Sequence, residues 1–307
     1  MKLGSFIRGS FSKKLSVFIA FTIFFSFVCV NTNAQTQGTN PRLLDALVKE
    51  TFYNVDTKTE LFLSDIDAER FLNDDPSITL VGDNPKILIF HTHSTETYFD
   101  SKNIYEGVIA VGKSLKEALE SQYGIPTMHV AESFDMVNGQ QAFTGAYERM
   151  EIVISKLLKE NPSIEIAIDL HRDAVPDYEK PVTTINGEPT AQIMFFNGIC
   201  RLKTNGKTVP YAPYNEYISE NLSFSFNMQV TAEALYKNFA KKIYIAPYRY
   251  SLAMLPKSLL IEVGAQTNTA QEAKNAAPII AEILTRAVLN PKVGIAAPST
   301  SLLCYSP

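Results

Sequence analysis

The chain has 307 residues, of which 46% are hydrophobic and 20% are charged. These values are ordinary for a globular protein, and the length is enough for one good-sized core with an appendage. The formal net charge is −4, and it becomes −8 without the first 34 residues, which hold four basic residues and no acidic one. An acidic chain has no general electrostatic attraction for a polyanion, so nucleic acid is not expected as a partner.

The N-terminus is typical of an export signal. Two lysines precede an apolar run over residues 15–30, and small residues follow at Thr32 and Ala34. A basic flank, an apolar stretch and a small-residue cleavage site together indicate a secretory signal over residues 1–34. The run is shorter than the roughly 20 residues that a spanning helix prefers. An uncleaved membrane anchor is the alternative, and in both cases the folded part is expected to be exported.

Residues 35–84 are expected to form a linker and an N-terminal extension, because a polar start is followed by short apolar stretches between Asp-rich turns. From Pro85 onward, runs of strand length alternate with stretches of helical periodicity. In chain order we predict a strand at 86–89, a helix at 104–123, a strand at 125–131, a helix at 142–160, a strand at 164–170, a hairpin at Asn186-Gly187 between 182–184 and 191–196, a helix over most of 216–241, strands at 242–246 and 258–263, a helix at 270–289 and an irregular tail at 291–307.

Strands that alternate with helices predict an α/β fold over residues 85–290. The expected architecture is a three-layer sandwich, in which helices flank a mainly parallel mixed sheet. In such sheets the functional residues gather at the carboxyl ends of the strands. His93 and His171 follow or end predicted strands, and so does Glu262, so we expect these three side chains to lie close together.

Two imidazoles and a carboxylate are the ligand set of a catalytic zinc site, which leaves one position for water. His93 and Glu96 are three residues apart and can face one ion from a loop or a first helical turn, and His171 is the natural third ligand. A further carboxylate must take the proton of the attacking water and pass it to the leaving nitrogen. Glu262 is the candidate for this role, because its apolar neighbours favour a raised pKa.

The choice among the histidines leaves one alternative open. His91 would share a strand face with His93 and could replace it as a ligand, whereas His129, inside a predicted strand, is expected to be structural. The chain has three cysteines but no CxxC motif, so a thiolate zinc site is excluded.

The neighbours of His171 also have two interpretations. Asp169 and Asp173 are either partners that orient an imidazole or turn residues at the strand end. Arg172 could bind a substrate carboxylate or form a structural ion pair. Glu262 could likewise serve only as the partner of an arginine.

Three stretches of the sequence, with a hairpin between the second and the third, resemble the signatures of the stage II sporulation protein P family, and the resemblance covers about residues 85–290. The matching residues are Ile87 to Tyr98 followed by Val111-Gly112 and Leu115, then Asp169-Leu170-His171-Arg172-Asp173-Ala174, then the hairpin Asn186-Gly187 with Ala191, and finally Leu259 to Gly264 followed by Asn268-Thr269 and Glu272-Ala273.

This family is similar to zinc N-acetylmuramoyl-L-alanine amidases, so the resemblance implies an amidase- or zinc-carboxypeptidase-like fold and a peptidoglycan substrate. It implies cleavage of the bond between the lactyl group of the glycan and the L-alanine of the stem peptide, and a peptide-crosslink endopeptidase activity is also ascribed to the family. Carried over to this chain, His93, Glu96 and His171 become zinc ligands and Glu262 becomes the catalytic acid and base. Partner proteins of a cell-wall remodelling machine are a further implication.

The sequence departs from the family pattern in two places. Residues 199–253 fit poorly, and the extension at 35–84 is short for a member that engages several partners during engulfment. A role in the cell wall outside sporulation is therefore an alternative. Two other functions compete with the amidase: a zinc carboxypeptidase or endopeptidase with Arg172 holding a peptide carboxylate, and an inactive wall-binding module, for which a general base such as Glu262 would have no use.

Overall fold

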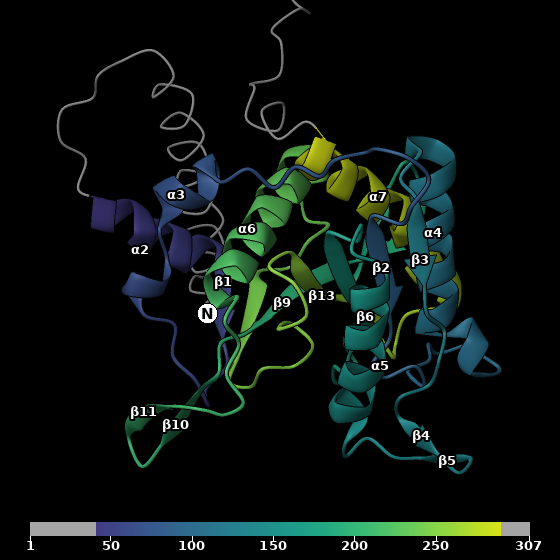
Figure 1. The fold of residues 1–307 in the computed structure, drawn as a ribbon, viewed down its shortest axis with the longest axis horizontal. Coiled ribbons are helices and arrows are strands. Elements are labelled where there is room, and N and C mark those ends of the chain that lie inside the picture. The colour runs from purple at the N-terminus through teal and green to yellow at the C-terminus, as the bar shows by residue number, and fades with distance from the viewer. Residues whose placement is uncertain (1–40, 290–307) are drawn as a thin grey trace, which may run out of the picture.

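A seven-stranded mixed sheet forms the centre of the fold (Figure 1). The computed structural model describes residues 41–289. The strands lie in the order β1-β12-β9-β13-β6-β2-β3. Every neighbouring pair is parallel except β9 and β13, which are antiparallel. The prediction of a mainly parallel mixed sheet is confirmed. The strand bounds are β1 Tyr53–Val55, β2 Ile87–Phe90, β3 Thr127–His129, β6 Ile166–Asp173, β9 Ile193–Gly198, β12 Ile243–Ala246 and β13 Ser258–Ala265.

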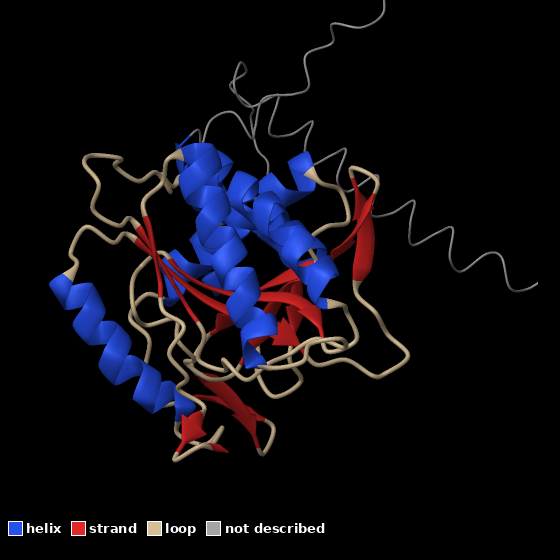
Figure 2. Cartoon of the chain, turned by 90° about the vertical axis from the view of Figure 1, so that its right-hand side faces the viewer, coloured by secondary structure: helices blue, strands red, loops and turns tan. Residues whose placement is uncertain are grey.

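Helices flank both faces of this sheet, as expected for a three-layer sandwich (Figure 2). One face packs against α4, α6 and α7 and encloses the larger apolar core. On the opposite face, α5 packs through Met150 and Ile154 on the side chains of Leu88, Phe90 and Ala167. The helices within the described residues are α2 Pro41–Phe52, α3 Ala68–Asn73, α4 Val108–Tyr123, α5 Ala146–Glu160, α6 Ile218–Leu235 and α7 Ala270–Leu289, with short 3-10 turns at Leu63–Asp65 and Ile104–Glu106.

The α5 face of the sheet is not covered by any described helix over β9, β12 and β1. Residues of a strand point alternately to its two faces, and Phe195 belongs to the core beneath α6 and α7. Met194 and Phe196 therefore point to the α5 side. Met194 is paired with Glu262, and Phe196 is paired with Tyr244 of β12. An open area of sheet consequently begins beside Glu262.

Local sequence signals explain several element ends. α4 stops at Gly124, whose φ of 63° is the left-handed conformation that favours glycine. α7 starts with a capping box, in which the Thr269 hydroxyl accepts from the Glu272 amide and the Glu272 carboxylate accepts from the Thr269 amide. Asn186-Gly187 has positive φ at both residues, as a two-residue hairpin turn requires. The predicted hairpin turn and the bounds of the last helix are confirmed.

Residues 41–84 pack onto the same core as the rest of the chain. β1 pairs with β12 at the edge of the sheet. The rings of Phe52 and Phe71 lie 5.3 and 5.8 Å from the ring of Phe226 in α6. The packed fold therefore extends back to residue 41, ahead of the boundary at residue 85 that the change in sequence pattern had suggested.

The second arm of the predicted hairpin is divided between two elements. β7 (Val182–Ile185) pairs with β8 (Glu188–Ala191), whereas the residues that follow form β9 of the central sheet. Ile193 and Phe195 explain why this segment joins the central sheet, because burying them in the main core is more favourable than leaving them on a hairpin. Two further hairpins are formed by β4 (Met136–Val137) with β5 (Gln140–Gln141) and by β10 (Arg201–Thr204) with β11 (Lys207–Pro210).

Some sequence-based expectations fall outside the described residues. These are the export signal over residues 1–34, the tail at 291–307 and any pairing that involves Cys304. Within residues 41–289, no helix combines the length and the apolar character that crossing a membrane would need.

Candidate metal centre and active site

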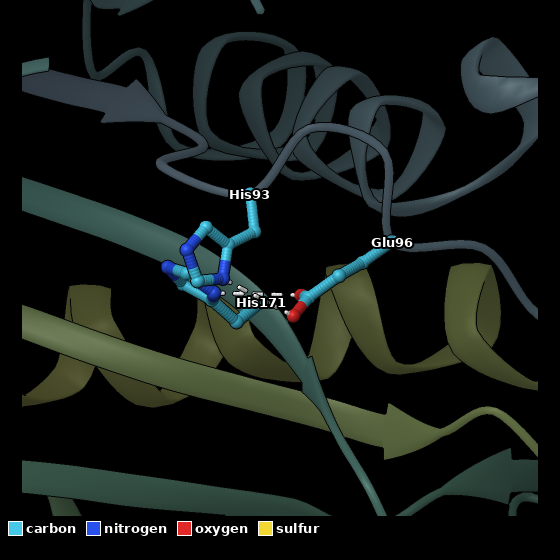
Figure 3. Close-up of side chains that lie close together, drawn as sticks. All are labelled: His93, Glu96 and His171. Atoms are coloured by element: carbon cyan, nitrogen blue, oxygen red, sulfur yellow. Dashed lines mark ion pairs between the residues drawn. The ribbon is translucent and has the colours of Figure 1, made fainter. Parts of the chain in front are cut away.

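Three side chains with metal-binding atoms meet beside the sheet (Figure 3). His93 and Glu96 come from the loop after β2, and His171 comes from β6. One ligand atom from each residue lies within 4.8 Å of the other two. Nδ1 of His93 is 3.7 Å from Glu96 Oε1, and Nδ1 of His171 is 3.4 Å from Glu96 Oε2. The structure therefore brings the three predicted ligands together.

The loop that carries His93 and Glu96 is fixed by buried polar contacts. The carboxylate of Asp135, which is fully buried, accepts from the Ser94 hydroxyl at 2.9 Å and from the Thr95 amide at 3.1 Å. The carbonyl of Glu96 accepts from the Val108 amide at the start of α4. A side chain at Gly107 would lie only 2.2 Å from that carbonyl oxygen, so the close approach of loop and helix needs a glycine.

A second buried carboxylate holds His171. Asp169 Oδ1 is 2.9 Å from His171 Nε2. Because Nε2 lies beside Asp169, the other ring nitrogen, Nδ1, is directed at Glu96. Asp169 is itself held by the amide and the hydroxyl of Thr92, at 2.8 and 2.6 Å. Burial alone would lower the pKa of His171, but the charges of Asp169 and Glu96 outweigh it and raise that pKa well above the ordinary value. Asp169 thus has the orienting position that carboxylates take behind metal-bound histidines.

Glu96 is held in its charged form. Burial acts to raise the pKa of Glu96, but His171, contacts with both histidines and the Arg172 amide, at 3.0 Å, together bring it below the usual range. The side chain therefore offers a carboxylate, which is the state a metal ligand needs.

Glu262 lies next to this cluster on β13, directly paired with His171 of β6. Its side chain is half-buried, and its Oε2 atom is buried with no hydrogen-bond partner among residues 41–289. Burial is the main cause that raises the pKa of Glu262 to about 8, and the negative charges of Glu96 and Asp173 act in the same direction. A carboxyl group poised near neutral pH beside potential metal ligands can accept and return a proton.

Glu262 also lines a pocket of about 530 Å³ on the open area of the sheet. Charged groups line it, and two of them form an ion pair, with Lys241 Nζ 3.1 Å from Asp173 Oδ2. The pocket is lined by Asn54, Asp173, Ala174, Met194, Phe196, Lys241, Lys242, Tyr244 and Glu262. It is therefore the recess from which a substrate can reach Glu262.

His91 is turned away from the ligand cluster. Its Nδ1 donates to the Leu170 carbonyl at 2.8 Å, so its Nε2 must accept, and it lies 2.8 Å from Nε2 of His129. A side-chain atom at Gly112 of α4 would lie 2.6 Å from His91 Nε2. Both nitrogens of His91 are thus engaged, and His93 is the histidine of this loop that faces Glu96 and His171.

Arg172 has a structural task in this arrangement. Its Nε donates to the Thr97 carbonyl at 2.9 Å, and its Nη1 donates to the Asp173 carbonyl at 3.2 Å. These contacts fasten the loop after β2 to β6. A role for Arg172 in binding a substrate carboxylate remains a prediction.

The residues present fit a zinc ion. Two imidazoles and one charged carboxylate with converging ligand atoms are the ligand set of catalytic zinc sites. Asp169 supplies the outer carboxylate behind His171, and Glu262, with an unpaired buried oxygen, is paired with His171 on the next strand. His93, Glu96 and His171 would therefore hold the ion.

The sequence model of the family described as stage II sporulation protein P matches residues 31–285. The chain belongs to the stage II sporulation protein P family. A curated relative, stage II sporulation protein P of Bacillus subtilis (strain 168), is 22% identical over 216 residues. The match covers 65% of this chain and 50% of the relative, so the chain spans about half the length of that protein.

Solved structures with similarity to the chain include several amidases, among them the following two. One is the CwlD amidase of Clostridioides difficile in complex with the GerS lipoprotein, at 12% identity and a TM-score of 0.39, with 65% of this chain and 94% of that chain covered. The other is the catalytic domain of CwlV, an N-acetylmuramoyl-L-alanine amidase of Bacillus (Paenibacillus) polymyxa var. colistinus, at 12% identity and a TM-score of 0.38, with 66% and 97% covered.

The structure gives a physical reason for the third stretch that resembles the stage II sporulation protein P family. Gly264 has a φ of 63°, and the pairing of β13 with β6 is irregular here. Asn268 then accepts from the Ala265 amide at 2.9 Å and donates to Pro181. These residues turn the chain from Glu262 into α7 and fasten it to Pro181, the residue before β7.

Three residues that contribute to this site were not predicted from the sequence: Asp135, Phe143 and Tyr147. Asp135 lies in a loop, and no periodic pattern marks it as the residue that holds Ser94 and Thr95. The rings of Phe143 and Tyr147 lie 5.3 and 5.4 Å from His93, although both belong to the α5 region. Packing between segments far apart in the chain places these residues, so the local sequence pattern around each of them carries no signal of its place.

Proposed function

We propose that this protein is an exported zinc hydrolase of peptidoglycan that cleaves the amide bond between the N-acetylmuramoyl group and L-alanine. One observation carries the proposal: His93, Glu96 and His171 converge, and Glu262, which is paired with His171 on the next strand, lines a pocket. Membership of the stage II sporulation protein P family supports the cell wall as the site of action and sporulation as the setting. Export rests on the sequence of residues 1–34.

The residues of the chain would divide the reaction between them. Zinc held by the three ligands supplies polarisation of the scissile carbonyl and a lowered pKa of water. Glu262 takes the proton of the attacking water and then delivers it to the L-alanine nitrogen, so that the carbon–nitrogen bond breaks. The products are a free lactyl carboxylate on the glycan and a free amino group on the peptide. Asp169 keeps His171 in position throughout.

A digest of purified sacculi tests the reaction. The wild-type chain with zinc should release peptides that begin with a free L-alanine amino group and leave glycan strands without peptides. Shortened peptides on intact glycan would show that the protein is a carboxypeptidase or endopeptidase and not an amidase. Binding to sacculi without any release, unchanged by Glu262→Gln, would leave only a wall-binding module.

Metal analysis tests the ligand assignment separately. Glu96→Ala and His171→Ala should each lose the stoichiometric zinc that the wild-type chain retains. Glu106→Ala is the matched control, because Glu106 lies in the same connection between β2 and α4 and contacts Lys102 rather than a ligand. Zinc retained in both ligand variants would remove the proposed site.

A further inference from the structure

A row of aromatic rings leads away from the candidate metal centre. The Tyr147 ring lies 5.4 Å from His93 and 5.6 Å from Tyr250. Tyr248 follows at 6.1 Å from Tyr250, and Tyr211 at 4.9 Å from Tyr248. We call Tyr147, Tyr250, Tyr248 and Tyr211 the tyrosine row. Its members come from α5, from the segment after β12 and from the residue after β11, so tertiary packing alone assembles it.

The backbone beneath the row is fixed by close contacts. A side-chain atom at Gly198, at the end of β9, would lie 2.0 Å from the Tyr248 carbonyl oxygen and 2.7 Å from the Tyr250 ring. The Tyr211 amide donates to Cys200 at 2.8 Å, and the Arg201 amide donates to Pro247 at 2.8 Å. The rings are therefore held in place before any ligand arrives, which reduces the entropy lost on binding.

The row is accessible and uncharged. Tyr211 and Tyr248 are 38% and 37% exposed, and the other two rings are half-buried. The neighbouring guanidinium groups are bound elsewhere, since Arg249 pairs with Glu151 and Arg201 pairs with Asp65. A ligand that lies along the row thus meets aromatic faces and phenol hydroxyls, while both neighbouring guanidinium groups are already paired with carboxylates.

We infer that the tyrosine row binds the glycan strand of the substrate, an inference that rests on the proposed function. Sugar rings present C–H groups on their faces and hydroxyls at their edges. The negative face of an aromatic ring attracts such C–H groups, and a tyrosine hydroxyl can hydrogen-bond at the edge. A row of half-exposed tyrosines therefore matches an uncharged polysaccharide.

The other side of Glu262 suits the stem peptide instead. A stem peptide carries carboxylates and an amino group, and the pocket beside Glu262 contains Lys241, Lys242 and Asp173. Phe196 marks the border, because it lines this pocket while its ring lies 4.8 Å from Tyr250. The bond to be cut joins glycan to peptide, so it would lie where the uncharged row and the charged pocket meet.

Binding of N-acetylglucosamine oligosaccharides, which have the sugar faces and hydroxyls of the glycan but no lactyl carboxylate, tests this inference without any need for catalysis. In the full chain carrying Glu262→Gln, replacement of Tyr211 and Tyr248 together by alanine should weaken binding on the order of 10-fold or more. Replacement of both by phenylalanine should keep most of the affinity, because the ring faces remain. Tyr178→Ala is the control, since Tyr178 is 87% exposed and lies outside the row.

The outcomes separate this inference from the proposed function. Glycan binding that is absent in the parent chain, or unchanged by the double alanine variant, overturns the inference even if sacculi are cleaved. Loss of glycan binding in the alanine variant, with binding kept in the phenylalanine variant, supports it even if no cleavage is found. In an active enzyme, the double alanine change should raise KM for sacculi more than it lowers kcat.

Discussion

His171 and Glu262 are paired residues on adjacent parallel strands, β6 and β13. The pairing places a candidate metal ligand and a candidate proton acceptor side by side on the rigid part of the fold. Functional groups on strands of a packed sheet keep their separation better than groups on loops. The separation of these two candidate groups is therefore set by the sheet itself.

Glu262→Gln should abolish most of the activity while leaving the zinc content unchanged. The amide keeps the shape of the side chain but cannot accept a proton, and general-base catalysis contributes on the order of 10²- to 10⁴-fold. The rate of L-alanine amino-group release from sacculi measures the loss, and metal analysis of the same preparation measures the zinc. Loss of zinc in this variant would instead show that Glu262 is a metal ligand.

Asp169→Asn should weaken zinc binding roughly 10- to 100-fold, the usual effect of removing a carboxylate behind a metal-bound histidine. The change removes the negative charge beside His171 Nε2 and one of the acceptors for Thr92. Competition with a chelator gives the affinity. Asp173→Asn is the matched control on the same strand, because Asp173 pairs with Lys241 and contacts no candidate ligand. Equal effects of the two variants would contradict an orienting role for Asp169.

Gly112→Ala should destabilise the fold, by roughly 1–3 kcal/mol, as overpacking of a core does. In an open helix the same change would stabilise by about 0.5–1 kcal/mol. Here the added methyl group would lie within 2.6–2.8 Å of the His91 and His129 rings. Urea unfolding measures the difference, with Ser114→Ala in the same helix as a control. A gain in stability for Gly112→Ala would show that the histidine pair is not closely packed.

The His91–His129 pair should make the metal-free protein sensitive to acid. Burial, with help from Lys116, lowers the pKa of His129 to about 4, and burial with the charge of His129 lowers that of His91 to about 3. In the unfolded chain both imidazoles take up a proton near pH 6.5, whereas in the folded chain they stay neutral to a lower pH. The stability contributed by the neutral rings is therefore complete above about pH 6.5 and is lost as the pH falls through about 4.

His129→Gln provides the measurement, because glutamine can still bond to His91 Nε2 but does not titrate. Urea unfolding with a chelator present, at about pH 7 and about pH 4.5, should show that the wild-type chain loses more unfolding free energy than the variant does. Parallel losses would mean that the pair is already protonated in the folded chain.

Local patterns predicted much of the fold because they act over a few residues. The apolar periodicity placed a helix at 270–289, which is α7 at Ala270–Leu289, and Asn186-Gly187 placed a hairpin turn. β1 was not predicted, since a three-residue edge strand has almost no periodicity of its own. The two parts of the stretch after the turn were also merged, because only pairing with β13 separates β9 from the hairpin.

The sequence by itself determined which residue types stand near the ends of the central strands, and it pointed to the family that the comparison then showed. His93, Glu96, His171 and Glu262 could be named because strand patterns and residue spacing are short-range properties. Only the tertiary structure decided that His91 turns toward His129, that Arg172 bonds to backbone carbonyls, and that four tyrosines from three segments form one row. Each of these depends on contacts between residues far apart in the chain, which are set by the order of strands and the packing of helices.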